Sequence, residues 1–244
     1  GGVIPICATF FAFSDYMKPA LRMASLMELP VKFMWTHDAF RVGEDGPTHQ
    51  PIEQEAQLRL LEKVHNHRKR PSMLVLRPAD SAETTLSWKL ALENKTTPTG
   101  LIFTRQNIQE VSDYSKAKSI SRGAYLVNSV DTPELILIAN GSEVGTAVAA
   151  CELLNRDIQI ISVPSEGLFR SQSKSYQEQI IPPGIPRAGI TAGLSVALLG
   201  LVGDETRIHS LNHFGYSAPA KVLDEKFGFT PELFAKKIES WLNA

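Results

Sequence analysis

The stretch Val31-Lys-Phe-Met-Trp35, followed by Thr36-His-Asp-Ala-Phe-Arg-Val-Gly-Glu-Asp-Gly-Pro-Thr-His-Gln-Pro51, decides how this chain is interpreted. Its mostly apolar and aromatic opening favours a buried strand. The 13 residues from 37 to 49 then hold two His, two Asp, one Glu and two Gly. Ligands bind at the carboxyl ends of strands in open α/β sheets, so this loop lies where a site is expected. Imidazoles and carboxylates there can hydrogen-bond hydroxyls and move protons near neutral pH.

Short apolar runs recur along the rest of the chain and alternate with more polar, helix-like stretches. The predicted strands span residues 31–35, 73–76, 101–104, 135–139, 158–163 and 208–211. The clearest predicted helices span 81–94 and 142–154, and each begins with Ser, a good N-cap residue. This alternation predicts an α/β protein with two three-layer units and mostly parallel sheets, the first unit being incomplete at its N-terminus.

Composition and charge exclude several classes of protein. The 244 residues are 43% hydrophobic and 21% charged, which is typical of globular proteins. The net charge of −1 gives no reason to expect nucleic acid or an acidic membrane as a partner. No apolar run reaches the roughly 18–20 residues that span a bilayer. The presence of only two cysteines, Cys7 and Cys151, argues against a disulfide framework and a zinc site and favours a cytoplasmic protein.

The polar segment around residues 111–132 is rich in Ser, Lys and turn residues, which indicates a boundary. We therefore expect one α/β unit over residues 1–112, a linker over 113–132 and a second α/β unit over 133–244. The chain begins Gly-Gly-Val-Ile-Pro without Met, and we expect it to be part of a longer protein.

Two further groups of residues are candidates for chemistry. Arg105 follows the predicted strand 101–104, where its guanidinium suits a phosphate or carboxylate, although a surface ion pair is the plainer alternative. Phe10, Phe13 and Tyr16 recur every three residues, which predicts that they share one face of a helix. Such a stripe is usually core, but it can also form a wall for a flat heterocycle.

Other polar groups have plainer interpretations. The His-rich loop could be a polar loop whose histidines cap backbone groups, and its spacing matches no zinc pattern, so we predict no metal ligand in it. Asn140-Gly-Ser-Glu143 opens a predicted helix whose amides could hold an anion, yet such turns are common. His209 and His213 are expected to be core or interface histidines.

Together these residues resemble the transketolase family. The loop Thr36-His37-Asp38 with Gly43-Glu-Asp-Gly-Pro-Thr-His-Gln-Pro51 looks like the signature of that family. Four further stretches are similar to family segments and occur in the family's order: Leu76-Arg-Pro-Ala-Asp80, Thr104-Arg-Gln-Asn107, Leu135-Ile-Leu-Ile-Ala-Asn-Gly-Ser-Glu143 and Phe214-Gly-Tyr-Ser-Ala-Pro219. The resemblance covers essentially the whole chain.

The resemblance implies the later part of a pyrimidine-binding domain, followed by a C-terminal domain. It implies thiamine diphosphate as cofactor, with Mg²⁺ or another divalent cation held mainly by a diphosphate-binding domain that this chain lacks. Phe10, Phe13 and Tyr16 match the aromatic wall that packs on the aminopyrimidine ring. The cofactor supplies the electron sink for transfer of a two-carbon ketol unit between sugar phosphates in the pentose phosphate pathway.

The resemblance also implies roles for four polar residues. His37 and Arg105 match residues that hold the sugar phosphate, and Asp45 matches the residue that reads a substrate hydroxyl. His49 matches the residue near the ketol hydroxyls that is implicated in substrate binding and proton transfer, and is the candidate catalytic residue.

This sequence departs from the family pattern in two ways. Ala39-Phe-Arg41 replaces a Ser-Ile-Gly-like stretch, which adds bulk and charge beside the expected site. The Glu that activates the aminopyrimidine is expected upstream of Gly1, so we expect the isolated chain to be inactive. A homodimer is implied by the family. Two alternatives stay open: a dihydroxyacetone synthase-like enzyme, and a non-catalytic partner-binding or regulatory module.

Overall fold

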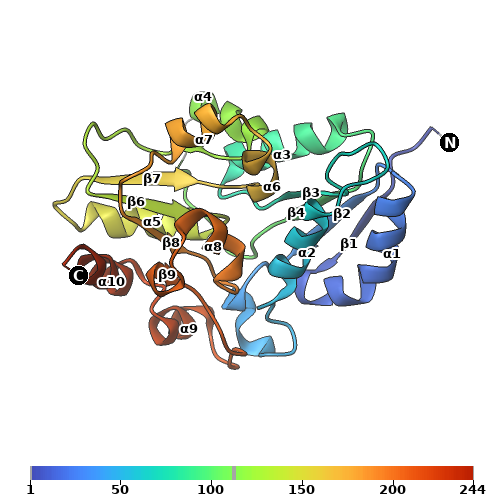
Figure 1. Cartoon of the computed structure of the whole chain (residues 1–244). Helices are drawn as coiled ribbons and strands as arrows, with labels where there is room; N and C mark the ends of the chain where they lie inside the picture. The colour runs from blue at the N-terminus through green and yellow to red at the C-terminus, as the bar shows by residue number, and fades with distance from the viewer. Residues whose placement is uncertain (1, 112–113, 244) are drawn as a thin grey trace.

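The computed structural model describes residues 2–111 and 114–243, which form two β-sheets, each with helices on its faces (Figure 1). The first sheet has four parallel strands in the order β1-β2-β4-β3. Their bounds are β1 (Ile6–Phe10), β2 (Lys32–Thr36), β3 (Leu74–Leu76) and β4 (Thr99–Ile102). β1 lies at the edge of the sheet, and most of its residues are exposed.

The second sheet has five strands in the order β5-β7-β6-β8-β9, of which only β5 is antiparallel to its neighbour. Their bounds are β5 (Tyr125–Leu126), β6 (Leu135–Ala139), β7 (Ile158–Ser162), β8 (Arg187–Ile190) and β9 (Ile208–His209). All five residues of β6 are buried, as expected of a central strand that is covered on both faces. The predicted α/β class with mostly parallel sheets is therefore confirmed.

Helices cover both sheets. Those of the first unit are α1 (Ser14–Leu26), α2 (Gln54–Lys63) and α3 (Ser81–Glu93), with the 3₁₀ segments η1 (Phe11–Phe13) and η2 (Phe40–Asp45). The later ones are α4 (Tyr114–Ala117), η3 (Lys118–Arg122), α5 (Glu143–Glu152), α6 (Glu166–Arg170), α7 (Lys174–Ile180), α8 (Val196–Val202), η4 (Glu205–Arg207), α9 (Ala220–Phe227) and α10 (Pro231–Leu242). The segment that we expected to be a linker thus contains α4, η3 and β5.

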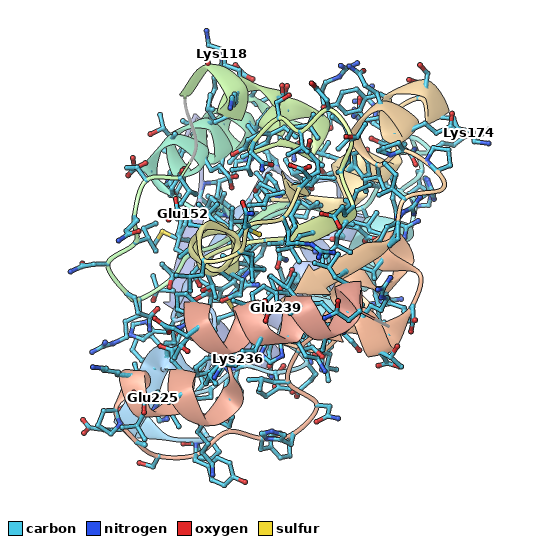
Figure 2. All side chains as sticks on the ribbon, turned by 90° about the vertical axis from the view of Figure 1, so that its left-hand side faces the viewer. Lys118, Glu152, Lys174, Glu225, Lys236 and Glu239 are labelled. Atoms are coloured by element: carbon cyan, nitrogen blue, oxygen red, sulfur yellow. The ribbon has the colours of Figure 1, made fainter. Side chains whose placement is uncertain are left out.

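The helix α10 shows how the sequence pattern produces a layer. Its buried residues Phe234, Ala235, Ile238 and Trp241 recur at helical spacing, and the helix packs against α5. Figure 2 shows the opposite face, where charged side chains such as Glu239 extend away from the sheet. Among the described residues, no helix is long and apolar enough to cross a bilayer.

All six predicted strands exist, with ends that differ by up to two residues, but the apolar pattern did not reveal β1, β5 or β8. One of the two predicted N-caps was wrong, and the other was confirmed. The N-cap of α3 is Asp80, whose carboxylate accepts a hydrogen bond from the Glu83 amide at 2.9 Å. Ser142 is the N-cap residue of α5, as predicted, although its hydroxyl bonds to side chains rather than to the backbone of the helix.

Candidate functional site

The site lies at the carboxyl ends of three neighbouring strands, β1, β2 and β4. Phe10 pairs with Thr36 across β1 and β2, and Trp35 pairs with Ile102 across β2 and β4. The parallel strands therefore end at nearly the same level. The predicted site residues, Phe10 at the end of β1 and the others in the segments that follow the strands, meet at this edge of the sheet.

Aromatic rings form one side of the site. The Phe10 and Phe13 rings are nearly parallel, with centroids 6.1 Å apart. Phe13 also contacts Tyr16 at 6.1 Å and the His49 ring edge-on at 5.1 Å. Tyr16 is 82% exposed, and with Phe13, Thr9 and Met17 it lines an open cavity of about 450 Å³.

The prediction that Phe10, Phe13 and Tyr16 share a helical face was wrong. Phe10 is the last residue of β1, Phe13 lies in the 3₁₀ turn η1, and Tyr16 lies in the first turn of α1. The period of three is misleading because pairing with β2 keeps the chain extended as far as Phe10. The rings nevertheless come together, since the tight turn η1 folds the strand end against the start of the helix.

His37 occupies the centre of the polar side. Its backbone is left-handed, with φ of 63°, and its ring stacks on Phe10 with centroids 3.7 Å apart. Its Nδ1 shares a hydrogen bond of 2.8 Å with the Thr36 hydroxyl. Burial lowers the pKa of His37, and the charge of Arg105 lowers it further, whereas Asp45 acts to raise it. His37 therefore lies within electrostatic range of both residues.

Asp45 and Arg105 are exposed, and within residues 2–111 and 114–243 neither side chain has a hydrogen bond or an ion pair. His49 is half-buried, and its Nδ1 shares a hydrogen bond of 2.9 Å with the Thr48 hydroxyl, so its Nε2 remains available. The structure thus brings His37, Asp45, His49 and Arg105 together with polar groups free to meet a ligand.

The loop between β2 and α2 is shaped by glycines and held by the second unit. Gly43 and Gly46 have φ of 86° and 78°, which other residues rarely adopt. A Cβ on Gly46 would lie 3.3 Å from Ser217 Cβ. The buried Gln50 amide donates to the carbonyl oxygens of Gly43 (3.1 Å) and Tyr216 (3.0 Å). These contacts fix the loop between the two sheets.

Comparison with known families identifies both units. Residues 1–110 match the transketolase pyrimidine-binding domain, and residues 123–230 match the transketolase-like C-terminal domain. The chain belongs to the transketolase family.

Known transketolases align with this chain along nearly its whole length. The transketolase of Staphylococcus aureus is 42% identical over 247 aligned positions, which cover 98% of this chain and 36% of that protein. The transketolase of Pichia stipitis in complex with sedoheptulose 7-phosphate is 34% identical, with a TM-score of 0.84 over 98% of this chain and 34% of that one. The chain therefore spans about a third of the length of these relatives.

A second structure shares the fold at lower identity. It is described as a split-gene transketolase in the form of an inactive β4 tetramer. It is 21% identical, with a TM-score of 0.74 over 99% of this chain and 77% of that chain. This likeness extends the fold comparison to a protein chain closer in length.

A buried ionic cluster beside the loop between β2 and α2 is the main feature that the sequence did not reveal. At its centre is Arg77, which is 1% exposed. Its Nη2 lies 2.7 Å from Asp38 and 2.6 Å from Glu143, and its Nη1 lies 3.2 Å from Glu55. These acids come from the loop, α5 and α2, so one guanidinium joins both units.

A local signal for this cluster exists in the transketolase-like motifs. Leu76-Arg-Pro-Ala-Asp80 carries Arg77, and Asn140-Gly-Ser-Glu143 carries Glu143. Gly141 allows the approach, because a Cβ there would lie 2.6 Å from Arg77 Nε. Glu143, at the start of α5, forms ion pairs with two arginines, Arg41 and Arg77. A structural role for this turn is therefore better supported than anion binding.

The remaining predicted residues have simple positions. His209 is partly buried, with its ring centroid 4.4 Å from that of Phe229, whereas His213 is exposed. In the part of the chain that the structure describes, no three His, Cys, Asp or Glu side chains are placed to hold a metal ion.

Proposed function

We propose that this chain provides the pyrimidine side of the thiamine diphosphate site and part of the sugar-phosphate channel of a transketolase. The complete protein would transfer a two-carbon ketol unit from a ketose phosphate to an aldose phosphate, in the pentose phosphate pathway. The observation that carries the proposal is the meeting of His37, Asp45, His49 and Arg105 at one sheet edge, beside stacked aromatic rings.

The residues present fit the pyrimidine side of thiamine diphosphate. The cavity beside Phe13 and Tyr16 is open and largely apolar, and the exposed Tyr16 ring could pack on a flat heterocycle. When bound, the cofactor supplies the electron sink for breaking and forming the carbon–carbon bond. Phe10, Phe13 and Tyr16 would hold its pyrimidine ring and exclude water from that face.

The polar residues would hold and orient the sugar phosphates. Arg105 offers a guanidinium to the phosphate, and His37 lies close enough to add a second donor. The Asp45 carboxylate accepts a hydrogen bond from a substrate hydroxyl. His49 would bind the ketol hydroxyls through Nε2 and exchange a proton there, because its Nδ1 is already engaged by Thr48.

We propose the division into a pyrimidine-binding unit (1–112), a connecting segment (113–132) and a C-terminal unit (133–244). The partners proposed are a diphosphate-binding domain that carries Mg²⁺ or another divalent cation and a second copy of the chain, in the cytoplasm. The Staphylococcus aureus relative is nearly three times as long as this chain, which leaves room for such a domain. We therefore expect the 244-residue polypeptide alone not to catalyse transfer.

The first test is calorimetric titration with thiamine diphosphate and Mg²⁺. We expect no binding to the 244-residue chain, and both binding and ketol transfer once the diphosphate-binding domain is supplied on the same or a separate polypeptide. Clear binding to the chain alone would instead favour a self-contained, non-catalytic module. Absence of ketol transfer by the complete protein would overturn the proposal.

Replacing Arg105 by Ala in the complete protein should raise KM for a phosphorylated sugar by about tenfold or more, because a charged hydrogen bond is worth about 1.5–3 kcal/mol. The KM for the same sugar without its phosphate should change little. The control is Arg68→Ala, since Arg68 lies in the loop before β3, at the opposite edge of the sheet. An equal rise in both KM values would make Arg105 a structural residue.

A further inference from the structure

Arg41 is the unusual residue of the loop, and it does not point into the site. It is only 7% exposed although it is charged. Its Nε lies 2.8 Å from Asp224 of α9, and its Nη1 lies 2.7 Å from Glu143 of α5. The expectation that its charge lies beside the substrate site was wrong, because two carboxylates of the second unit draw it the other way.

The backbone of Arg41 connects to the segment that carries Arg105. The Gln106 side-chain amide donates to the Arg41 carbonyl oxygen at 2.8 Å. The carbonyl oxygen of the same side chain accepts a hydrogen bond of 2.6 Å from the Thr104 hydroxyl. Arg105 lies between these two anchored residues, while its own side chain is exposed. The position of Arg105 therefore depends on where the Arg41 carbonyl lies.

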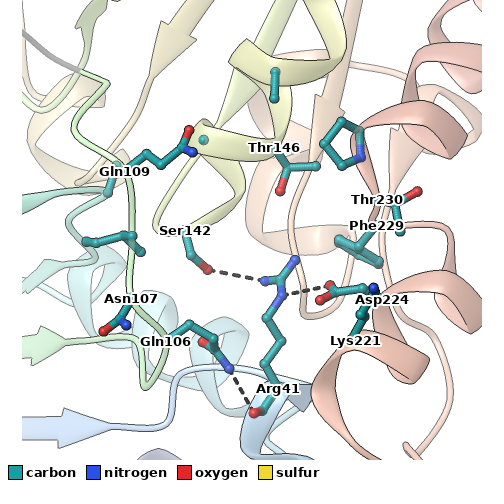
Figure 3. A pocket seen from close by; sticks show the side chains of 15 residues that line it. Arg41, Gln106, Asn107, Gln109, Ser142, Thr146, Lys221, Asp224, Phe229 and Thr230 are labelled. Atoms are coloured by element: carbon teal, nitrogen blue, oxygen red, sulfur yellow. Dashed lines mark hydrogen bonds and ion pairs between the residues drawn. The ribbon is translucent and has the colours of Figure 1, made fainter.

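The segment that carries Gln106 borders an open space. A cavity of about 430 Å³ lies beside Arg41, between the Gln106 segment and the helices α5, α9 and α10 (Figure 3). In Figure 3, the guanidinium of Arg41 crosses this space to reach Asp224 and Ser142. On one flank, Phe40 packs edge-on against Phe227 at 5.1 Å. The hydrogen bonds and ion pairs of Arg41 join the loop to α5 and α9 beside this cavity.

We infer that Arg41 is a positioning residue, which sets the affinity of the site for the phosphate group by placing Gln106 and hence Arg105. This inference rests on the proposed function. Without the guanidinium, Glu143 keeps Arg77 as a partner but Asp224 loses its cation, and the loop loses its ion pairs to α5 and α9. The backbone carbonyl of residue 41 remains as the acceptor for Gln106 but is held less firmly, so Arg105 loses its fixed direction towards the phosphate.

The test is equilibrium binding to the complete protein with its cofactor, using ribose 5-phosphate and free ribose as probes. An aldose without a ketol donor does not turn over, so the measurement gives Kd directly. Arg41→Met should raise Kd for ribose 5-phosphate about 5–20-fold, the size of effect expected for coupled neighbours, with less than about a twofold change for ribose. The value of kcat at saturating substrates should stay within about threefold.

Three further variants separate positioning from stability. Arg41→Lys keeps the charge but not the fork that reaches both carboxylates, and should restore part of the affinity. Asp224→Asn should change the ratio of the two Kd values in the same direction, and its effect should not add to that of Arg41→Met. Ile238→Val, deep in α10, is the matched control, because it destabilises the C-terminal unit without touching the loop.

The possible results are distinct. If Arg41→Met lowers Tm but leaves the ratio of the two Kd values unchanged, or if Ile238→Val changes that ratio equally, the inference is overturned. If Arg41→Met does not fold, Asp224→Asn decides the question by the same ratio. A wild-type protein that binds ribose 5-phosphate no better than ribose overturns the proposed function, and this inference with it.

Discussion

Arg77→Met should lower the free energy of unfolding by about 3–5 kcal/mol, the cost of removing one partner from a buried ionic cluster. Arg77 is almost fully buried and contacts Asp38, Glu55 and Glu143. Glu143 keeps Arg41 as a partner, but Asp38 has no other ion pair among the described residues. Met retains most of the hydrocarbon volume, so the loss reports chiefly on the unpaired carboxylate rather than on a cavity.

Chemical denaturation of wild type and variant measures this effect. Adding Asp38→Asn to Arg77→Met should recover part of the loss, because the unpaired carboxylate is then gone. The control is Arg156→Ala, whose partly exposed ion pair with Glu134 should contribute no more than about 1 kcal/mol. A loss for Arg77→Met as small as that of the control would show that the cluster does not join the two units.

Lowering the pH from 6.5 to 4 should reduce the free energy of unfolding by about 3 kcal/mol, because of the titration of His209. Its ring packs against Phe229 and Phe234 at 4.4 and 5.5 Å. Burial lowers the pKa of His209 to about 4, and the charge of Lys237 contributes in the same direction. The unfolded imidazole takes up a proton near pH 6.5, but the folded one does so only near pH 4. Stability from this residue is therefore complete above pH 6.5 and is lost as the pH falls to 4.

The measurement is the difference in unfolding free energy between wild type and His209→Gln, followed from pH 7 to pH 4. The difference is needed because Glu83 has the opposite effect on stability. Burial raises the pKa of Glu83 to about 7, so acidification protonates this buried carboxylate and removes the cost of burying its charge. The advantage of wild type over the variant should shrink by about 3 kcal/mol over this range. The exposed His67→Gln is the control. A difference that is independent of pH would remove His209 as the cause.

Part of the site could be predicted from the local sequence. The apolar run 135–139 coincides with β6, and the rule that ligands bind at the carboxyl ends of strands located the loop that carries His37 and Asp45. The same rule singled out Arg105 and the loop that holds His49, and the resemblance to transketolase added specific roles for both residues, which lie near His37 in the structure. Their roles in binding and proton transfer remain predictions.

The sequence by itself determined the α/β class, the family and the order of the motifs, because these depend on hydrophobic period and on short stretches of neighbouring residues. Only the tertiary structure decided that Phe10 ends a strand, and which acids Arg41 and Arg77 contact. Arg41 and Asp224 are 183 positions apart, and no local pattern indicates their pairing. The packing of one unit against the other brings such charges together. Burying a charge without a partner costs free energy, so each buried charge pairs with an opposite charge that the fold places beside it.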